Sequence, residues 1–173
     1  MNIILIGPMA SGKSTIGKEL ARSLKKDFFD VDSEIEKSCG AKISWIFDIE
    51  GEEGFREREK KILKEILADQ TNAVISTGGG IILDGENRKL LKEENKVIYI
   101  ETSIEEQLER LRGDSSRPLL DGSCNKKKTL SEINSQRAHL YKQCSNISFN
   151  NVNKSVKVTV NEIISTLKGG FDE

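Results

Sequence analysis

The stretch "GPMASGKST", Gly7 to Thr15, directly follows the short apolar run "NIILI" at the start of the chain. It contains the pattern Gly7-x-x-x-x-Gly12-Lys13-Ser14, which is typical of a phosphate-binding loop placed between a strand and a helix. In such a loop, glycines let backbone N–H groups converge on an anion, the lysine adds a positive charge, and the hydroxyl can bind Mg²⁺. The stretch therefore predicts binding of the phosphates of a nucleotide by Gly7, Ala10, Ser11, Gly12, Lys13, Ser14 and Thr15.

Short apolar runs typical of strands alternate with helical patterns along the rest of the chain. The runs are Ile3–Ile6, Phe28–Val31, Ala73–Ser76, Val97–Ile100 and, most weakly, Ile147–Phe149; the helical patterns are Lys13–Lys25, Glu52–Ala68, Glu86–Lys92, Ile104–Leu111, Leu130–Gln143 and Val156–Leu167. This alternation favours a parallel sheet covered by helices on both faces, with ligands at the carboxyl ends of the strands. We expect an α/β protein, a three-layer α/β/α sandwich around a five-stranded parallel sheet, of the P-loop kinase type.

Length and composition limit the other possibilities. The 173 residues, 36% of them hydrophobic, are enough for one domain, which we expect to span 1–173. A net charge of -1 gives no basic surface for nucleic acid or an anionic membrane. Three cysteines without C-x-x-C spacing suggest neither a disulfide framework nor a zinc site, and no apolar run reaches the roughly 20 residues of a membrane span. We expect a soluble, cytoplasmic monomer without nucleic-acid or membrane partners.

One segment has the composition of a mobile loop. Residues 113 to 128, "GDSSRPLLDGSCNKKK", combine Gly, Pro, Ser, Asp and Lys without periodicity. Loops of this kind often close over an active site. We expect a lid at about 113–124, and a frayed C-terminal tail at about 169–173.

The chain lacks the motifs of two large classes of nucleotide-binding protein. The Asn-Lys pairs at Asn95, Asn125 and Asn153 are not followed by the aspartate of a guanine-reading N-K-x-D, and no predicted strand ends in the Asp-Glu pair usual in motor ATPases. Asp30 and Asp32 follow the second strand instead, in "FFDVDSEIE". If they alternate along an extended segment, they point to opposite sides, so one could reach Mg²⁺ and the other a substrate hydroxyl.

Six motifs, in this order and over nearly the whole chain, resemble those of the shikimate kinases: "GPMASGKST", "FFDVDSEIE", "GFREREKKIL", "STGGG", "RPLL" and "RAHLYK". Shikimate kinases are small P-loop enzymes that use Mg-ATP to phosphorylate the 3-hydroxyl of shikimate, on the pathway to chorismate and the aromatic amino acids. The resemblance implies ATP and shikimate as ligands, Mg²⁺ as the metal, and shikimate 3-phosphate and ADP as products. Two alternatives stay open: another small-metabolite or nucleotide kinase, and a P-loop ATP-binding regulatory protein without turnover.

The resemblance also implies residues that read the carboxylate of shikimate. Arg56 and Arg137 match the family's carboxylate-binding arginines, and a guanidinium fork suits that group. The alternative is a pair of solvated helix arginines, since most arginines are exposed. Glu59 lies at i+3 from Arg56, so it could hold the guanidinium in place, or it could form an ordinary surface ion pair.

The resemblance assigns the hydroxyl end of the substrate as well. Asp32 matches the residue that contacts the hydroxyl to be phosphorylated, and Asp30 matches the one that reaches Mg²⁺ together with Ser14. Asp32 or Ser33 could instead merely cap a helix beginning near Glu34. The family uses the glycine run after the third strand for substrate contact, because backbone N–H groups can approach a ligand there. The resemblance assigns substrate contact to Gly79 first, and Gly78 and Gly80 give the backbone the geometry for it.

Two arginines are implied at the nucleotide. Arg117, before Pro118 in the expected lid, matches the arginine that meets the transferring phosphate, and Arg110 matches one placed against adenine. One departure is clear, because the family commonly has an acidic, proline-containing loop near adenine where this chain reads "SFNNVNKSVKVT". The adenine contacts of this loop are therefore not predicted. The only histidine, His139, is expected to be structural or solvated, and Trp45 and Phe47 are expected to pack.

Overall fold

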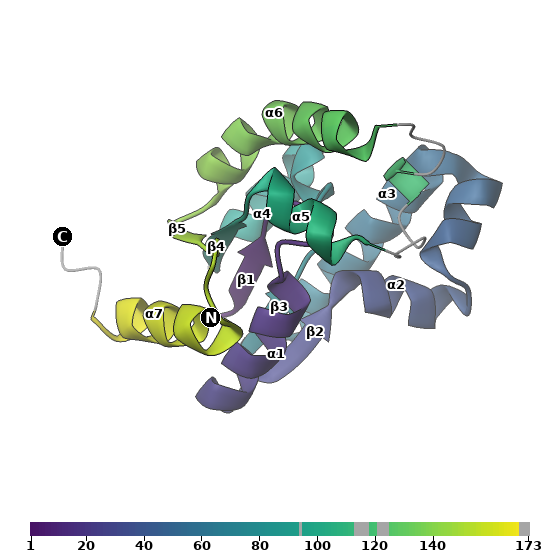
Figure 1. Cartoon of the computed structure of the whole chain (residues 1–173). Helices are drawn as coiled ribbons and strands as arrows, with labels where there is room; N and C mark the ends of the chain where they lie inside the picture. Colours follow the sequence, from purple (N-terminus) through teal and green to yellow (C-terminus); the bar gives the residue numbers. More distant parts are fainter. Residues whose placement is uncertain (94, 113–117, 121–124, 170–173) are drawn as a thin grey trace.

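Five parallel strands form one sheet in the order β2-β3-β1-β4-β5 (Figure 1). They are β1 (Ile3–Ile6), β2 (Asp27–Asp30), β3 (Ala73–Ser76), β4 (Lys96–Glu101) and β5 (Ile147–Asn150). This is a computed structural model, and it describes residues 1–93, 95–112, 118–120 and 125–169. Leu5 pairs with Ser76 and Asp30 also pairs with Ser76, so the carboxyl ends of β1, β2 and β3 lie at one level. The loops that follow these strands therefore meet at one edge of the sheet.

Helices cover both faces of the sheet. They are α1 (Lys13–Leu24), α2 (Val31–Cys39), α3 (Ile43–Asp69), α4 (Gly85–Lys92), α5 (Ile104–Arg110), α6 (Lys126–Cys144) and α7 (Val156–Lys168), with short 3-10 turns η1 (Ile81–Leu83) and η2 (Pro118–Leu120). Ile4 and Ile6 pack into one core cluster with α3, α4 and α6, whereas Ile3 and Leu5 pack into a second with α1 and α7. The alternation of β1 residues between two cores follows from the two-residue period of a strand. The predicted three-layer α/β/α sandwich is confirmed.

Three segments differ from the sequence-based expectation. Residues 31 to 39 are helical, and α3 begins at Ile43 rather than at Glu52. Gly51 has non-helical dihedral angles inside α3 (φ 71°, ψ −175°), so the helix is kinked there and its apolar periodicity is interrupted. Lys126–Lys128, which we expected to be part of an aperiodic segment, form the first turn of α6, because the Asn125 side chain caps it by accepting a hydrogen bond from the Lys128 N–H at 3.1 Å.

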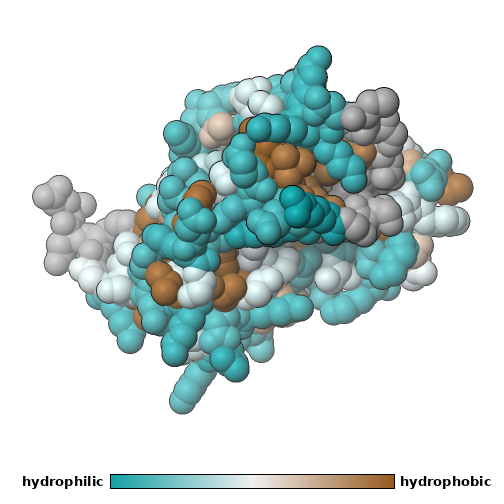
Figure 2. Space-filling model, in the orientation of Figure 1, coloured by the Kyte–Doolittle hydropathy of each residue, from teal (hydrophilic) through white to brown (hydrophobic). Residues whose placement is uncertain are grey.

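The structure describes only part of the lid and of the tail that we expected. Most of the expected lid, 113–117 and 121–124, and the end of the tail, 170–173, lie outside the described residues. Between the lid segments, η2 places Leu120 in a small apolar cluster with Leu111 and Leu130. Figure 2 shows apolar side chains gathered between α5 and α6 on a face that is otherwise mostly hydrophilic. In the described part of the chain, no helix combines the length and apolarity needed to cross a membrane.

Candidate active site

The phosphate loop connects β1 to α1 as its motif predicts. Gly7 has φ +147°, and a Cβ there would lie 2.5 Å from the Ile100 carbonyl oxygen, so only glycine fits beside β4. The Lys13 side chain is only 7% exposed, and its Nζ donates hydrogen bonds to the Gly7 and Pro8 carbonyls at 2.9 and 2.7 Å. The ammonium group is therefore held within the curve of the loop, at the N-terminus of α1.

Ser14 and Asp30 lie together beside this loop. The Ser14 hydroxyl donates to Asp30 Oδ2 at 2.5 Å and lies 3.3 Å from the Ser76 hydroxyl. A hydroxyl and a carboxylate oxygen are ligands that suit Mg²⁺, which usually keeps several waters and takes one or two protein oxygens beside substrate phosphates. Among the residues described, no group of three or more His, Cys, Asp or Glu side chains could form a dedicated metal cage. The oxygens of Ser14 and Asp30 thus fit the expected metal.

Our expectation of an extended segment through Asp32 is wrong. Asp30 ends β2, and Asp32 lies in the first turn of α2. Asp30 is the residue that caps α2, because its Oδ1 accepts from the Ser33 N–H at 3.1 Å. Because α2 begins between the two aspartates, their carboxylates lie in different surroundings. Asp30 contacts Ser14, whereas Asp32 lines an adjoining pocket.

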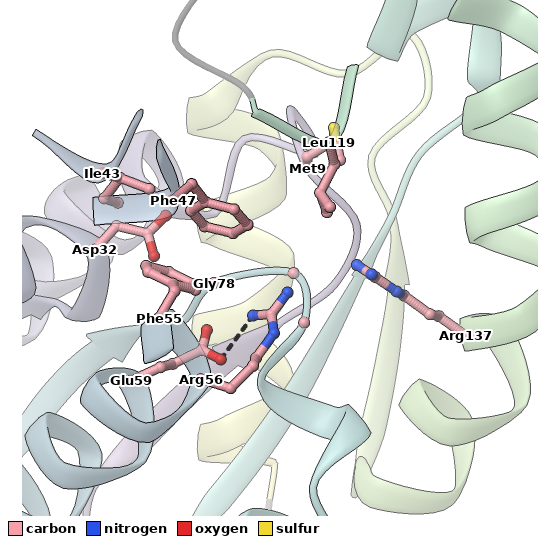
Figure 3. Close-up of a pocket in the computed structure, with 12 residues that line it drawn as sticks. Met9, Asp32, Ile43, Phe47, Phe55, Arg56, Glu59, Gly78, Leu119 and Arg137 are labelled. Atoms are coloured by element: carbon pink, nitrogen blue, oxygen red, sulfur yellow. Dashed lines mark hydrogen bonds and ion pairs between the residues drawn. The ribbon is translucent and has the colours of Figure 1, made fainter. Parts of the chain in front are cut away.

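This pocket lies beside the phosphate loop and is lined by residues from separate elements (Figure 3). Arg56 of α3 and Arg137 of α6 point into it from opposite sides. Arg137 is 7% exposed and therefore buried. Two guanidinium groups directed at one cavity can bind an anionic group between them, and the planar forks suit a carboxylate.

Glu59 holds Arg56 from below the pocket. Arg56 donates to Glu59 Oε2 at 2.8 Å and to the more exposed Glu52 at 3.0 Å. Glu59 is 0% exposed, so its contact with Arg56 is a buried ion pair and not the surface pair considered above. Burial raises the pKa of Glu59 to about 7 against the opposing effect of Arg56, and the negative charge of Asp32 adds to the rise. The same ion pairs outweigh burial at Arg56 and raise the pKa of its guanidinium.

The glycine run 78–80 lies directly against charged side chains of α3. A Cβ at Gly78 would lie 2.5 Å from Glu59 Oε1, and one at Gly80 would lie 2.3 Å from the Arg56 guanidinium carbon. The run itself lines the pocket, and the Tyr141 hydroxyl donates to the Gly79 carbonyl at 2.5 Å. The glycines therefore let the charged side chains approach the backbone, a role additional to the N–H contacts with substrate that we expected.

Apolar residues complete the pocket, and sequence reasoning missed most of them. Phe47 and Phe55 pack against each other with ring centroids 4.7 Å apart, and Met9 and Leu119 lie on the side of the phosphate loop and of η2. Phe47 thus packs as expected and also lines the pocket. Trp45, by contrast, is 56% exposed, so the expectation that it packs is wrong.

On the expected adenine side, Arg110 and the segment after β5 contact neighbouring parts of the chain. Arg110 donates to the Ala10 carbonyl at 2.9 Å and to Glu106 at 3.3 Å. In the stretch that follows β5, Asn150 closes a turn by accepting from the Val152 N–H at 2.9 Å, and Asn153 takes a left-handed conformation with φ 56°. Arg117 lies outside the described residues. His139 is exposed on α6, as expected.

The comparisons with known proteins agree with this geometry. A family model described as "Shikimate kinase" matches residues 9–168. A shikimate kinase from Francisella tularensis subsp. holarctica is 49% identical over 166 residues, which cover 96% of this chain and 94% of the relative.

Two solved structures are also similar. Shikimate kinase from Acinetobacter baumannii in complex with shikimate has a TM-score of 0.95 at 37% identity, covering 99% of this chain and 95% of that one. Shikimate kinase from Aquifex aeolicus has a TM-score of 0.82 at 38% identity, covering 98% and 97%. The chain belongs to the shikimate kinase family.

Proposed function

We propose that this chain transfers the γ-phosphoryl group of ATP to the 3-hydroxyl of shikimate, and that shikimate binds in the pocket of Figure 3. Members of the shikimate kinase family are ATP-dependent kinases of the pathway to chorismate. The main support for placing shikimate there is the pair of arginines, Arg56 and Arg137, which face one pocket beside the phosphate loop.

Each part of the acceptor matches a part of the pocket. Arg56 and Arg137 bind the carboxylate, while the rings of Phe47 and Phe55 pack against the carbon ring. Asp32 lies on the far side of the pocket from Arg137, where it contacts the hydroxyl to be phosphorylated (Figure 3). Phosphoryl transfer has a loose transition state that needs little early proton removal, so Asp32 chiefly orients the hydroxyl.

The donor end follows from the loop. Backbone N–H groups and Lys13 hold the phosphates at the N-terminus of α1. Ser14 and Asp30 would hold Mg²⁺, which supplies charge neutralisation for the phosphates when bound. Arg117, assigned by resemblance alone, meets the transferring phosphate. Catalysis then consists mainly of positioning and charge neutralisation.

The test is acceptor-dependent release of ADP. The protein is incubated with Mg-ATP, with and without shikimate, and ADP and phosphorylated shikimate are both measured. We expect the two products in equal amounts, with activity lost on chelation of the metal and regained with added Mg²⁺. ADP release that depends on gluconate or a nucleoside monophosphate instead would indicate the other kinase class. Tight ATP binding without release for any acceptor would indicate a binding protein.

A further inference from the structure

The outer side of the phosphate loop is held by side chains that come from distant parts of the chain. Gln107 of α5 donates from Nε2 to the Met9 carbonyl at 2.8 Å. Asn151, which follows β5, donates from Nδ2 to the Ser11 carbonyl at 2.9 Å. Arg110 donates to the carbonyl between them, that of Ala10. Three successive carbonyls of the loop are thus hydrogen-bonded to side chains.

These contacts determine where the N–H groups of the loop point. A trans peptide unit is planar, and its C=O and N–H bonds point in opposite directions. A donor that fixes the Met9 carbonyl therefore also fixes the Ala10 N–H, and a donor on the Ser11 carbonyl fixes the Gly12 N–H. Because the carbonyls point to the outer donors, these N–H groups point to the opposite side, as a phosphate cradle requires.

Both amide side chains are held in one orientation by a second contact. Asn134 Nδ2 donates to Gln107 Oε1 at 2.6 Å, and Thr159 Oγ1 donates to Asn151 Oδ1 at 2.9 Å. Gln107 is 0% exposed and Asn151 is 4% exposed. A rotated amide would place its oxygen against the loop carbonyl and leave buried polar atoms without partners, which is costly. The nitrogen of each amide is therefore kept facing the loop.

We infer that Gln107 and Asn151 are positioning residues of the phosphate loop, which set the N–H groups of Ala10 and Gly12 for the phosphates of ATP. The inference rests on the proposed function only in taking ATP as the ligand of the loop. It concerns the affinity for nucleotide, and for Asn151, which contacts the loop at Ser11, it predicts no effect on the arginine pocket.

The test uses uncharged substitutions of similar size, Asn151→Leu and Gln107→Met, so that no new charge repels the phosphates. The dissociation constants of ATP and of shikimate are each measured alone by calorimetry. We expect each variant to bind ATP at least about tenfold more weakly, a loss of about 1.4 kcal/mol. In Asn151→Leu, whose contact lies away from the pocket, shikimate affinity should be unchanged within about twofold. The weaker variants Thr159→Val and Asn134→Ala remove only the orienting contacts, and should weaken ATP binding in the same direction.

Asn2 provides a matched control at the opposite end of the sheet. It is 3% exposed, its Nδ2 donates to the Gln70 carbonyl at 2.7 Å, and its Oδ1 accepts from the Ala73 N–H at 2.9 Å. Asn2→Leu removes the same kind of buried bridge, so it should lower the melting temperature without changing the dissociation constant of ATP.

Three results would overturn the inference. The first is normal ATP affinity in folded Asn151→Leu and Gln107→Met proteins. The second is an equal loss of ATP affinity in Asn2→Leu, which would show that general destabilisation is the cause. The third is normal ATP affinity in Thr159→Val and Asn134→Ala. This result decides the question if Asn151→Leu and Gln107→Met do not fold. Failure of the proposed function differs from all three, because the unmodified protein would then bind ATP but not phosphorylate shikimate.

Discussion

The two ends of the site are built from different kinds of interaction. The phosphate loop is shaped by hydrogen bonds to its carbonyls, from the neutral amides of Gln107 and Asn151 and from the cations Lys13 and Arg110. The acceptor pocket is shaped by charges, with Arg56 and Arg137 directed into it and a buried Glu59 behind one of them. The pocket also includes a carboxyl whose burial raises its pKa to about 7. One end is specified by donors to loop carbonyls and the other by guanidinium groups and a buried ion pair, and each can be disturbed separately.

The largest effect is expected from Lys13→Ala at the phosphate end. This substitution removes the ammonium group that donates to the Gly7 and Pro8 carbonyls, and with it the charge that we propose stabilises the transferring phosphate. We expect kcat to fall by at least about a hundredfold, as for loss of one preorganised stabilising group, while shikimate affinity changes little. Steady-state kinetics and shikimate calorimetry measure both. A variant that retains a tenth of normal turnover would contradict this role.

The next effect concerns pH and the acceptor end. Burial raises the pKa of Glu59 to about 7 in the folded protein, above the 4.5 of an ordinary glutamate. The unfolded chain therefore loses this proton at lower pH than the folded protein, so ionisation of Glu59 disfavours folding. The contribution of Glu59 to the free energy of unfolding falls as pH rises from about 4.5 to about 7, by up to about 3 kcal/mol, and is constant above that range.

Glu59→Gln removes this titration. We expect the free energy of unfolding of the unmodified protein, relative to Glu59→Gln, to decrease by about 2 to 3 kcal/mol between about pH 5 and about pH 8. Urea unfolding at the two pH values measures the difference. The same comparison for a substitution at the exposed Glu57 should show little change. A difference that is constant with pH would mean that Glu59 keeps an ordinary pKa.

Removal of a pocket arginine is expected to have an intermediate effect. Arg137→Ala should weaken shikimate binding by about 10-fold to 150-fold, as expected for about 1.5 to 3 kcal/mol per charged hydrogen bond, with ATP affinity unchanged. Arg56→Ala should do the same and also destabilise the fold, because it leaves the carboxylate of Glu59 buried without its partner. Calorimetry and thermal unfolding of both variants test this. Equal loss of ATP and shikimate affinity would remove the distinction between the two ends.

The smallest effect is expected at Glu52, the second carboxylate on Arg56. Its side chain is 47% exposed, against 0% for Glu59. Exposed ion pairs contribute about 0.2 to 1 kcal/mol, so Glu52→Gln should change shikimate affinity by no more than a few-fold. A loss as large as that of Arg137→Ala would show that burial does not separate the two carboxylates.

Local sequence was sufficient where the determinants are local. The phosphate loop, the five strands and the three-layer order follow from one motif and from alternating patterns. The helix at 31–39 was considered only as an alternative beginning near Glu34, and the first part of α3 was missed because Gly51 interrupts its apolar periodicity. At Asp32, an extended reading of "DVD" was wrong because the Asp30 side chain caps a helix that begins at once.

The candidate site was less predictable because its contacts are long-range. Arg56 and Arg137 could be assigned only by resemblance, since nothing near either residue indicates that both face one pocket. The contact from Asn151 to the phosphate loop joins residues 140 positions apart, and that from Gln107 joins residues 98 apart. A single sequence contains no periodicity or motif that reports such pairs. The i+3 spacing of Glu59 did indicate its contact with Arg56, but not its burial.

The central claim is that the acceptor pocket reads a carboxylate through two arginines, and one binding experiment tests it most directly. The dissociation constants of shikimate and of its neutral carboxamide analogue are measured for the unmodified protein and for Arg137→Ala. We predict that the unmodified protein binds the carboxamide at least about tenfold more weakly than shikimate, a difference of about 1.4 kcal/mol, and that Arg137→Ala largely loses this preference. A carboxamide penalty of equal size in both proteins would contradict the account.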